Sequence, residues 1–321
     1  MVSVMENKLI IFSGAANPAL SKAIASEIGE KIGDAEITRF ADGESQIKIR
    51  DNVRGADCFI IQPTAPPVNE NVMELLIIID ALVRASARRV TAVMPYYGYG
   101  RQDRKAEPRV PISAKLVANL ITASGADRVL AMDLHASQIQ GFFDIPLDHL
   151  YVNPVFLKYF TSPEFKALVK NFDDLCIVAP DAGGVERARA IAKRLGVTLV
   201  IVDKRRPRPN QADVMNVIGN VKDKTAIIVD DLVDTAGTLI KVAAALKKEG
   251  ARRTIAACTH GVLSGNAIEK IEKSDIERLV ISDSIALKKT SKKIKVLSVA
   301  ELLGKAIKSI HMERSISELF A

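Results

Sequence analysis

The chain has 321 residues and a formal net charge of +7, with 48% hydrophobic and 26% charged residues. These values are ordinary for globular proteins and exclude an intrinsically disordered chain. No run of about 18 apolar residues is present, and the N-terminus lacks the layout of a signal peptide, so we expect no membrane partner. The three cysteines, Cys58, Cys176 and Cys258, stand far apart. This spacing predicts neither a zinc site nor a disulfide framework and indicates a cytoplasmic setting.

Apolar, β-branched runs alternate with helical patterns in the first half of the chain. Asn17 and Pro18 suit the N-cap and the first position of a helix, and Asp42–Gly43 is a hairpin signal. Strands are expected at 9–14, 37–40, 46–49, 57–62, 89–95 and 128–133, and helices at 18–29, 72–87 and 113–123.

The second half repeats this rhythm. Strands are expected at 176–179, 198–202, 225–229, 254–258 and 279–282, and helices at 185–195, 238–248, 267–273 and 299–312. Such alternation predicts βαβ units and a mostly parallel sheet in each half. We therefore expect an α/β fold with two domains, 1–150 and 151–298, and a final helix within 299–321 that is able to pack back on the first domain. In such sheets, ligands bind at the carboxyl ends of the strands.

The strongest motif is 227–238, in which an apolar strand delivers Asp230 and Asp231 and a short turn, 234–238, enters a helix. Backbone N–H groups of the turn and the helix N-terminus favour an anion such as phosphate. The two carboxylates would repel that phosphate, so they suit a sugar diol or hydrated Mg²⁺. Together these groups predict a pentose phosphate site. The alternative is an ordinary capped helix with solvated aspartates.

A second motif, 200–210, places four cations, among them Lys204 and Arg206, after a strand, and its two prolines exclude a helix. Such a loop suits a polyphosphate whose charge must be stabilised during transfer. The alternatives are a solvated basic loop and a nucleic-acid patch.

Three further strand ends carry candidate residues. The segment 93–105 leads through tyrosines into Arg101, Arg104 and Lys105, which suit nucleotide phosphates, although tyrosines more often serve packing. His135 and Asp181 each follow a predicted strand, where they could bind a metal or be structural. Neither a Walker loop nor a dinucleotide fingerprint is present.

These motifs, in this order, resemble the ribose-phosphate diphosphokinases (PRPP synthetases) of the phosphate-dependent class I type. The resembling segments are 39–44, 95–103, 133–143, 180–184, 204–210 and 230–238. The resemblance implies two phosphoribosyltransferase-like domains, each with a mostly parallel sheet flanked by helices. It also implies transfer of the β,γ-diphosphoryl group of ATP to the 1-hydroxyl of ribose 5-phosphate, giving PRPP and AMP, with Mg²⁺ as cofactor.

The resemblance further implies a role for each matching position. Catalysis is assigned to Lys204 and Arg206, and the metal to His135 and Asp181. The residues for ATP are Phe40, Asp42, Gly43, Glu44, Arg101, Gln102, Asp103 and His135. The residues for ribose 5-phosphate are Arg206, Asp230, Asp231, Asp234, Thr235, Ala236, Gly237 and Thr238. The hairpin residues 40–44 would serve an ATP site shared between subunits of a homo-oligomer, expected to be a hexamer.

The family's regulatory phosphate and ADP site is matched only in part. Its matching positions are Arg54, Gln140, Asp148, Ser315 and Ser317. Asn52 stands where the family usually has serine, and 107–109 reads Glu-Pro-Arg instead of a basic–Ser–Arg pattern. Losing a hydroxyl and reversing a charge should weaken anion binding there.

Three other functions each fit part of these observations. A phosphoribosyltransferase shares the 230–238 motif but would have one such domain and no basic loop like 204–208. A non-catalytic regulatory paralogue would typically have a degraded loop or acid pair, and both are intact. Nucleic-acid binding lacks a recognised motif, so we expect no nucleic-acid partner.

Overall fold

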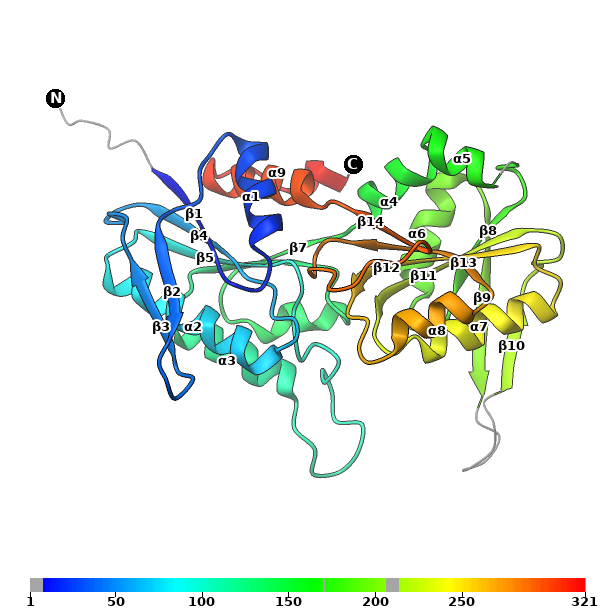
Figure 1. The fold of residues 1–321 in the computed structure, drawn as a ribbon, viewed down its shortest axis with the longest axis horizontal. Helices are drawn as coiled ribbons and strands as arrows, with labels where there is room; N and C mark the ends of the chain where they lie inside the picture. Colours follow the sequence, from blue (N-terminus) through cyan, green and yellow to red (C-terminus); the bar gives the residue numbers. More distant parts are fainter. Residues whose placement is uncertain (1–7, 170, 206–213, 321) are drawn as a thin grey trace. The chain divides into compact units, whose positions relative to one another are not determined.

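The structure is a computed structural model that describes residues 8–169, 171–205 and 214–320. The chain forms two compact units (Figure 1). The first comprises Met1–Tyr151, Ser284–Ala286 and Ser298–Ala321, and the second comprises Val152–Asp283 and Leu287–Leu297. The last helix of the chain is thus part of the first unit.

The first unit is built on a parallel sheet with the strand order β1-β4-β5-β6-β7. Its strands are β1 (Leu9–Ser13), β4 (Asp57–Ile61), β5 (Arg89–Met94), β6 (Arg128–Met132) and β7 (Leu147–Leu150). The sequence predicted all of them except β7. This edge strand has four residues, only one of them fully buried, so it lacks the continuous apolar run that marks the others.

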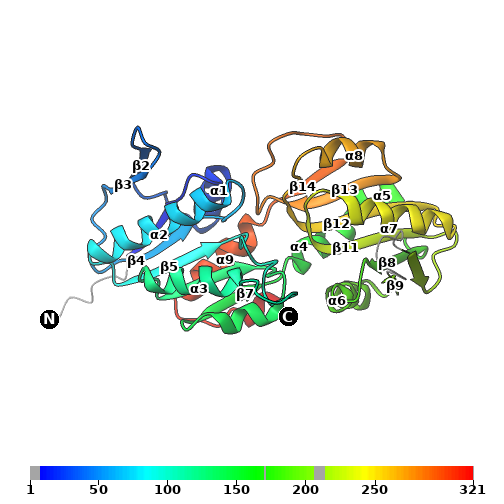
Figure 2. The same ribbon diagram turned by 90° about the horizontal axis from the view of Figure 1, so that it is seen from below.

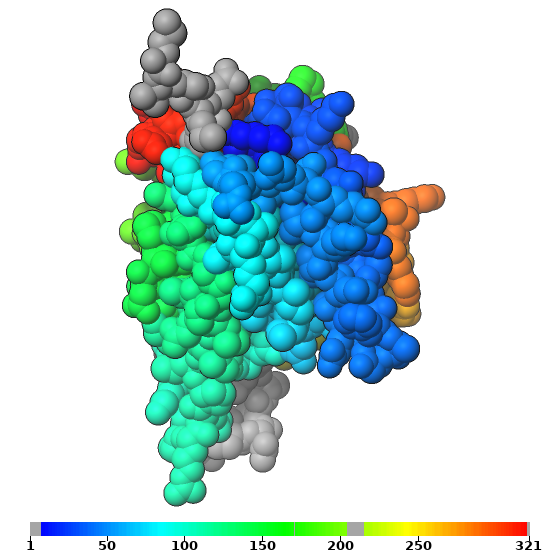
Figure 3. All heavy atoms as spheres, turned by 90° about the vertical axis from the view of Figure 1, so that its left-hand side faces the viewer, coloured from blue at the N-terminus to red at the C-terminus, as the bar shows by residue number. Residues whose placement is uncertain are grey.

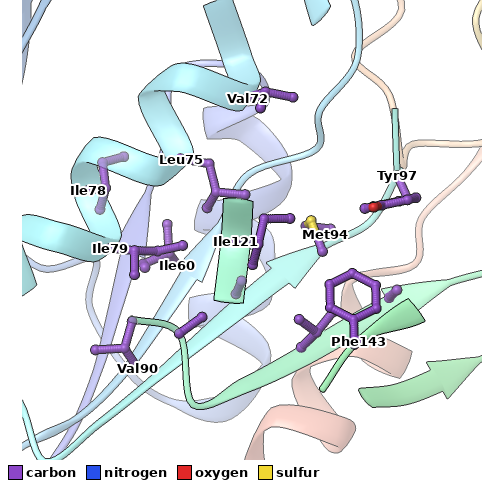
Figure 4. Close-up of a cluster of buried hydrophobic side chains, with 14 of the residues drawn as sticks. Ile60, Val72, Leu75, Ile78, Ile79, Val90, Met94, Tyr97, Ile121 and Phe143 are labelled. Carbon is purple, nitrogen blue, oxygen red and sulfur yellow. The ribbon is translucent and has the colours of Figure 1, made fainter. Parts of the chain in front are cut away.

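Helices cover both faces of this sheet. They are α1 (Pro18–Ile28), α2 (Val68–Arg84), α3 (Ser113–Ala123) and α9 (Ala300–His311). Figure 1 shows α1 and α9 on one face and α2 and α3 on the other. The Asn17 side chain caps α1 by accepting the Leu20 N–H at 3.2 Å, as predicted. Between the sheet and α2 and α3 lies a dense apolar core (Figure 4).

The predicted hairpin forms a sheet of its own. Strands β2 (Ala35–Arg39) and β3 (Ser45–Ile49) pair antiparallel, and Figure 2 shows them standing clear of the five-stranded sheet. The side chains of Arg39 in β2 and Glu70 in α2 form an ion pair at 2.5 Å. The hairpin is thereby attached to α2, and its tip at 40–44 projects.

A buried carboxylate joins α9 to the sheet. Asp57 is fully buried and accepts two bonds from Arg89, at 2.8 and 2.5 Å. His311, at the end of α9, lies 2.8 Å from the same carboxylate, and Arg89 also donates to the Ile310 carbonyl at 3.1 Å. These contacts fix the C-terminal helix at the amino edge of the sheet, where β4 and β5 begin.

The second unit contains a seven-stranded sheet with the order β10-β9-β8-β11-β12-β13-β14. Only β10 runs antiparallel to its neighbour. The strands are β8 (Leu175–Ala179), β9 (Thr198–Arg205), β10 (Val214–Ile218), β11 (Thr225–Val233), β12 (Arg253–Gly261), β13 (Ile276–Ser282) and β14 (Ile294–Leu297). The α/β class with mostly parallel sheets is confirmed in this unit as in the first.

The helices of the second unit also flank both faces of the sheet. They are α4 (Asn153–Phe160), α5 (Pro163–Val169), α6 (Val185–Leu195), α7 (Gly237–Lys248) and α8 (Ala267–Lys273). Figure 1 shows α7 and α8 on one face and α4 to α6 on the other. The sequence missed α4, α5, β10 and β14, all of which are short.

Two further properties concern the described chain as a whole. No helix in the described ranges is long and apolar enough to cross a membrane. The three cysteines are free and buried, and burial raises the pKa of the Cys58 thiol to about 12.

Candidate functional site

The acid pair lies at the carboxyl edge of the second unit's sheet. Asp230 and Asp231 lie within β11, which continues to Val233, so the expectation that the strand ends before them was wrong. The strand is longer because β12 extends alongside it, with Asp230 opposite Cys258 and Val233 opposite Gly261. Asp231 is only 5% exposed, so the alternative of a solvated pair is wrong for this residue.

Two adjacent acids in such surroundings are electrostatically unfavourable. Burial, followed by the charge of Asp231, raises the pKa of Asp230 well above its ordinary value, while Arg187 acts in the opposite direction. Burial and the same two carboxylates also raise the pKa of the neighbouring Cys258. A group perturbed by burial and a specific charged partner is a candidate for a functional site.

The cation that balances this pair is Arg187, which the sequence analysis missed. Its Nη1 lies 3.9 Å from Asp230 Oδ1 and 3.8 Å from Asp231 Oδ1. Arg187 is in the first turn of α6, 43 positions before Asp230 in the sequence. Only the pairing of β8 with β11 brings the two segments together, so no local signal could have identified this contact.

The turn after β11 has the geometry of an anion site. Ala236 has a left-handed backbone, with φ of 62°, and Gly237 opens α7. The Asp234 carbonyl accepts the Ser264 N–H at 3.1 Å, which anchors the start of the turn. Thr235 and Thr238 are exposed. The hydroxyls and the unpaired N–H groups of the first helical turn can therefore meet a phosphate from solvent.

Asp181 follows β8, the strand next to β11. Its Oδ1 accepts the Gly184 N–H at 3.0 Å, which shapes the turn into α6. A carboxylate has about four lone-pair sites, so this bond leaves capacity for a hydrated cation. Within residues 8–169, 171–205 and 214–320, no three His, Cys, Asp or Glu side chains gather as a metal site.

The basic loop falls largely outside the described part of the chain. Strand β9 ends at Arg205, and β10 begins at Val214. Lys204 lies in the described backbone of β9, but its side chain and the whole of Arg206 lie outside the described residues.

In the first unit, residues predicted to bind ATP follow β5 and β6. Asp103 accepts a bond from Gln138 at 2.6 Å, and Gln102 accepts one from the Ser113 hydroxyl. Arg101 and His135 are exposed. A Cβ on Gly100 would lie 3.7 Å from that of His135, so the two segments are neighbours.

The tyrosines beside this group have different environments. Tyr96 and Tyr97 are buried, and Tyr97 donates to the Ala114 carbonyl at 2.7 Å, as the packing alternative predicted. Tyr99 is bonded to Asn69 through its hydroxyl.

The hairpin tip is a hydrogen-bonded turn with an exposed aromatic ring. Phe40 is 50% exposed. Asp42 accepts the Glu44 N–H at 3.1 Å, and Gly43 has φ of 97°, which favours glycine. Figure 3 shows the hairpin, in blue, at the surface beside α2, in cyan. The structure thus leaves the Phe40 ring accessible to a ligand or a partner.

Three of the predicted regulatory residues, Asp148, Ser315 and Ser317, line one cavity of about 600 Å³ in the first unit. Three cations that the sequence analysis did not single out line it as well, namely Arg89, Arg128 and Arg314. Arg128 and Asp148 form an ion pair at 2.6 Å. Arg54 and Gln140 are not among the lining residues of this cavity.

The chain is similar to known proteins over almost the whole length of both chains. Residues 9–125 match the N-terminal domain of ribose phosphate pyrophosphokinase, and residues 206–321 match the phosphoribosyl synthetase-associated domain. The ribose-phosphate pyrophosphokinase of Bacillus subtilis is 53% identical over 318 residues, 98% of each chain. That of Thermotoga maritima is 54% identical over 314 residues, also 98% of each. The crystal structure of phosphoribosylpyrophosphate synthetase from Mycobacterium smegmatis is 38% identical, covers 95% of this chain and 99% of its own, and has a TM-score of 0.88.

Proposed function

The chain belongs to the ribose-phosphate pyrophosphokinase family, and from this premise we propose how its residues carry out the reaction. The chain transfers the β,γ-diphosphoryl group of ATP to the 1-hydroxyl of ribose 5-phosphate, giving PRPP and AMP. The second unit binds ribose 5-phosphate, and the first unit, which includes the C-terminal helix, binds ATP. The observation that carries this division is the acid pair of β11 beside the anion-binding turn of α7.

The geometry of that edge matches a pentose phosphate. The 5-phosphate binds the 234–238 turn, where N–H groups and threonine hydroxyls donate to it. Asp230 and Asp231 accept the ring hydroxyls, since ionised carboxylates only accept hydrogen bonds. The substrate is then held at both ends, which fixes the position of its 1-hydroxyl.

The transferring group needs charge stabilisation more than covalent help from the protein. Lys204 and Arg206 provide it, by donating to the oxygens of the diphosphoryl group. Mg²⁺, when bound, neutralises charge on the ATP phosphates, and the oxygens of Asp181 fit this cation. The imidazole of His135 is a less favourable ligand for Mg²⁺. His135 therefore acts on the phosphates or on water of the hydrated metal.

ATP is held by Arg101, Gln102, Asp103 and the hairpin tip 40–44. The exposed ring of Phe40 offers a face on which adenine stacks. We assign this tip to a neighbouring copy's ATP site, within a homohexamer. Large apolar side chains on α2 and α3, Met73, Val83, Leu116 and Leu120, are exposed in the single chain. Apolar surface of this kind is typical of protein interfaces.

The cavity lined by Asp148, Ser315 and Ser317 is the proposed regulatory anion site. Its three arginines and serine hydroxyls suit a phosphate. A cytoplasmic setting, in which the buried cysteines stay reduced, is part of the same proposal.

One measurement tests the proposed function. We expect AMP to be released from ATP and Mg²⁺ when ribose 5-phosphate is added and not when it is omitted. AMP or ADP formation that is indifferent to the sugar phosphate would contradict the proposal. A phosphoribosyltransferase would instead require PRPP and a base.

A further inference from the structure

Arg187 occupies a position that none of the roles above uses. It is the third residue of α6, and its side chain is 17% exposed. The chain reaches α6 through the turn that follows β8, so the first turn of this helix lies at the same sheet edge as Asp230 and Asp231. The guanidinium faces both carboxylates rather than one.

The two distances are informative because they are long. The separations of 3.9 and 3.8 Å exceed the ~2.7–2.9 Å of a charged hydrogen bond. Arg187 thus balances the charge of the pair without donating to either oxygen that it faces. The guanidinium itself therefore does not occupy the hydrogen-bonding positions of the two oxygens that it faces.

Another ion pair of the same unit shows what a purely structural contact looks like here. Arg253 donates to both carboxylate oxygens of Glu277, at 2.7 and 2.6 Å. Both carboxylate oxygens of Glu277 thus accept hydrogen bonds from Arg253. Arg187 carries the same chemical group but lies 3.9 and 3.8 Å from the oxygens that it faces.

We infer that Arg187 is a positioning residue for ribose 5-phosphate, which keeps Asp230 and Asp231 as a pair of hydroxyl acceptors. Burial and mutual repulsion act against two ionised carboxylates at this edge. A protonated member would lose acceptor capacity, and its bond to a substrate hydroxyl would no longer be assisted by a negative charge. The charge of Arg187 acts against this protonation, although it does not cancel the repulsion between the two acids. The inference rests on the proposed function, because it names the role of a third residue at the same site.

The test compares Arg187→Gln and Arg187→Lys with Arg189→Gln, an exposed arginine of the same helix. Ribose 5-phosphate binding is measured by calorimetry, and KM for each substrate by AMP release. Arg187→Gln should weaken ribose 5-phosphate binding about tenfold or more, with KM for ATP and kcat within about threefold, since uniform substrate binding is lost. Arg187→Lys should stay within about threefold of the parent because it restores the charge.

The outcomes separate this inference from the proposed function. A parent protein that releases no AMP with ribose 5-phosphate refutes the function itself. An active parent whose Arg187→Gln variant binds ribose 5-phosphate like Arg189→Gln refutes only the inference, as does an equal rise in KM for ATP. If Arg187→Gln does not fold, Arg187→Lys decides. A tenfold loss of ribose 5-phosphate binding in a folded lysine variant, about as large as removal of the charge should cause, overturns the inference.

Discussion

Two acidic sites, one in each unit and each with a buried aspartate, are built in opposite ways. In the first unit, Asp57 is closed by Arg89 at 2.5 and 2.8 Å and by His311 at 2.8 Å. In the second, Asp230 and Asp231 stand beside one another with Arg187 almost 4 Å away. Asp57 lies at the amino edge of its sheet, where no substrate is expected, and the pair lies at a carboxyl edge.

The difference distinguishes a carboxylate that holds the fold from carboxylates that we propose to bind a ligand. A buried charge whose bonds are all made within the protein stabilises one arrangement of its neighbours, here the docking of α9. Two adjacent acids with repulsion left in place are less stable by themselves, and a ligand that donates hydrogen bonds to them can offset this cost. Four experiments test these assignments.

The largest effect is expected at the basic loop of the second unit. Lys204→Ala should lower kcat about 10³-fold, since it removes a cation that stabilises the transferring group, while KM for ATP changes little. The control is Lys222→Ala, an exposed lysine in the turn after β10. Steady-state AMP release measures both variants, and a kcat near that of the parent would remove Lys204 from the catalytic role.

The second-largest effect is expected at Asp57, whose carboxylate is bonded by Arg89 and His311. Asp57→Asn should lower the free energy of unfolding by about 3 kcal/mol, because it leaves Arg89 without its ionised partner. Activity is compared at 25 °C and saturating phosphate, because Arg89 also lines the proposed regulatory cavity. Per folded molecule it should stay within about threefold, since Asp57 is not at a carboxyl edge. Chemical denaturation is compared with Asp80→Asn, whose exposed pair with Arg84 should contribute much less to stability. Equal effects of the two variants would show that the Asp57 cluster is not structural.

Substitution at Asp230 should have the opposite result, with substrate binding weakened and the fold stabilised. Asp230→Asn should raise KM for ribose 5-phosphate about 30-fold, the loss expected for a hydrogen bond to a charged group. The same variant should be more stable than the parent near pH 7–8, by about 1 kcal/mol, because repulsion with Asp231 is removed.

The sign of the pH dependence follows from the raised pKa of Asp230. The folded state favours the protonated carboxyl, so this contribution to stability is present below the ordinary aspartate pKa of about 3.9 and is lost as the pH rises through the raised value. The asparagine variant does not titrate there. Its stability advantage should therefore shrink as the pH falls towards 4, and an advantage that grows instead would contradict the assigned cause.

The smallest effect concerns the proposed regulatory phosphate site, to which the resemblance assigns positions 52 and 107 although they do not line the cavity of the first unit. With Asn52 and Glu107 at two positions of the family's phosphate site, activity without added inorganic phosphate should remain at about half its maximum or more, because anion binding there is weakened. AMP release is measured in phosphate-free buffer over a phosphate titration. Activity that vanishes without phosphate would show that the site keeps its full regulatory strength.

Much of this fold is encoded locally. Continuous apolar strands such as β4 and β8 are buried on both faces, so their composition alone identifies them. The cap of α1 by Asn17 and the hairpin turn at Gly43 are likewise fixed by residues that lie close together in the chain. Short edge strands such as β7 and β14 were missed because their residues are only partly buried and carry a weak periodic signal.

The sequence by itself determined the α/β class, the candidate residues at strand ends and the family resemblance, because each depends on short motifs. Only the tertiary structure decided that β11 runs past Asp230, that Arg187 faces the acid pair, and that α9 returns to the first unit through Asp57 and His311. These features depend on contacts between residues up to 254 positions apart. Such contacts arise from strand pairing and packing, which leave no pattern in any one stretch of the chain.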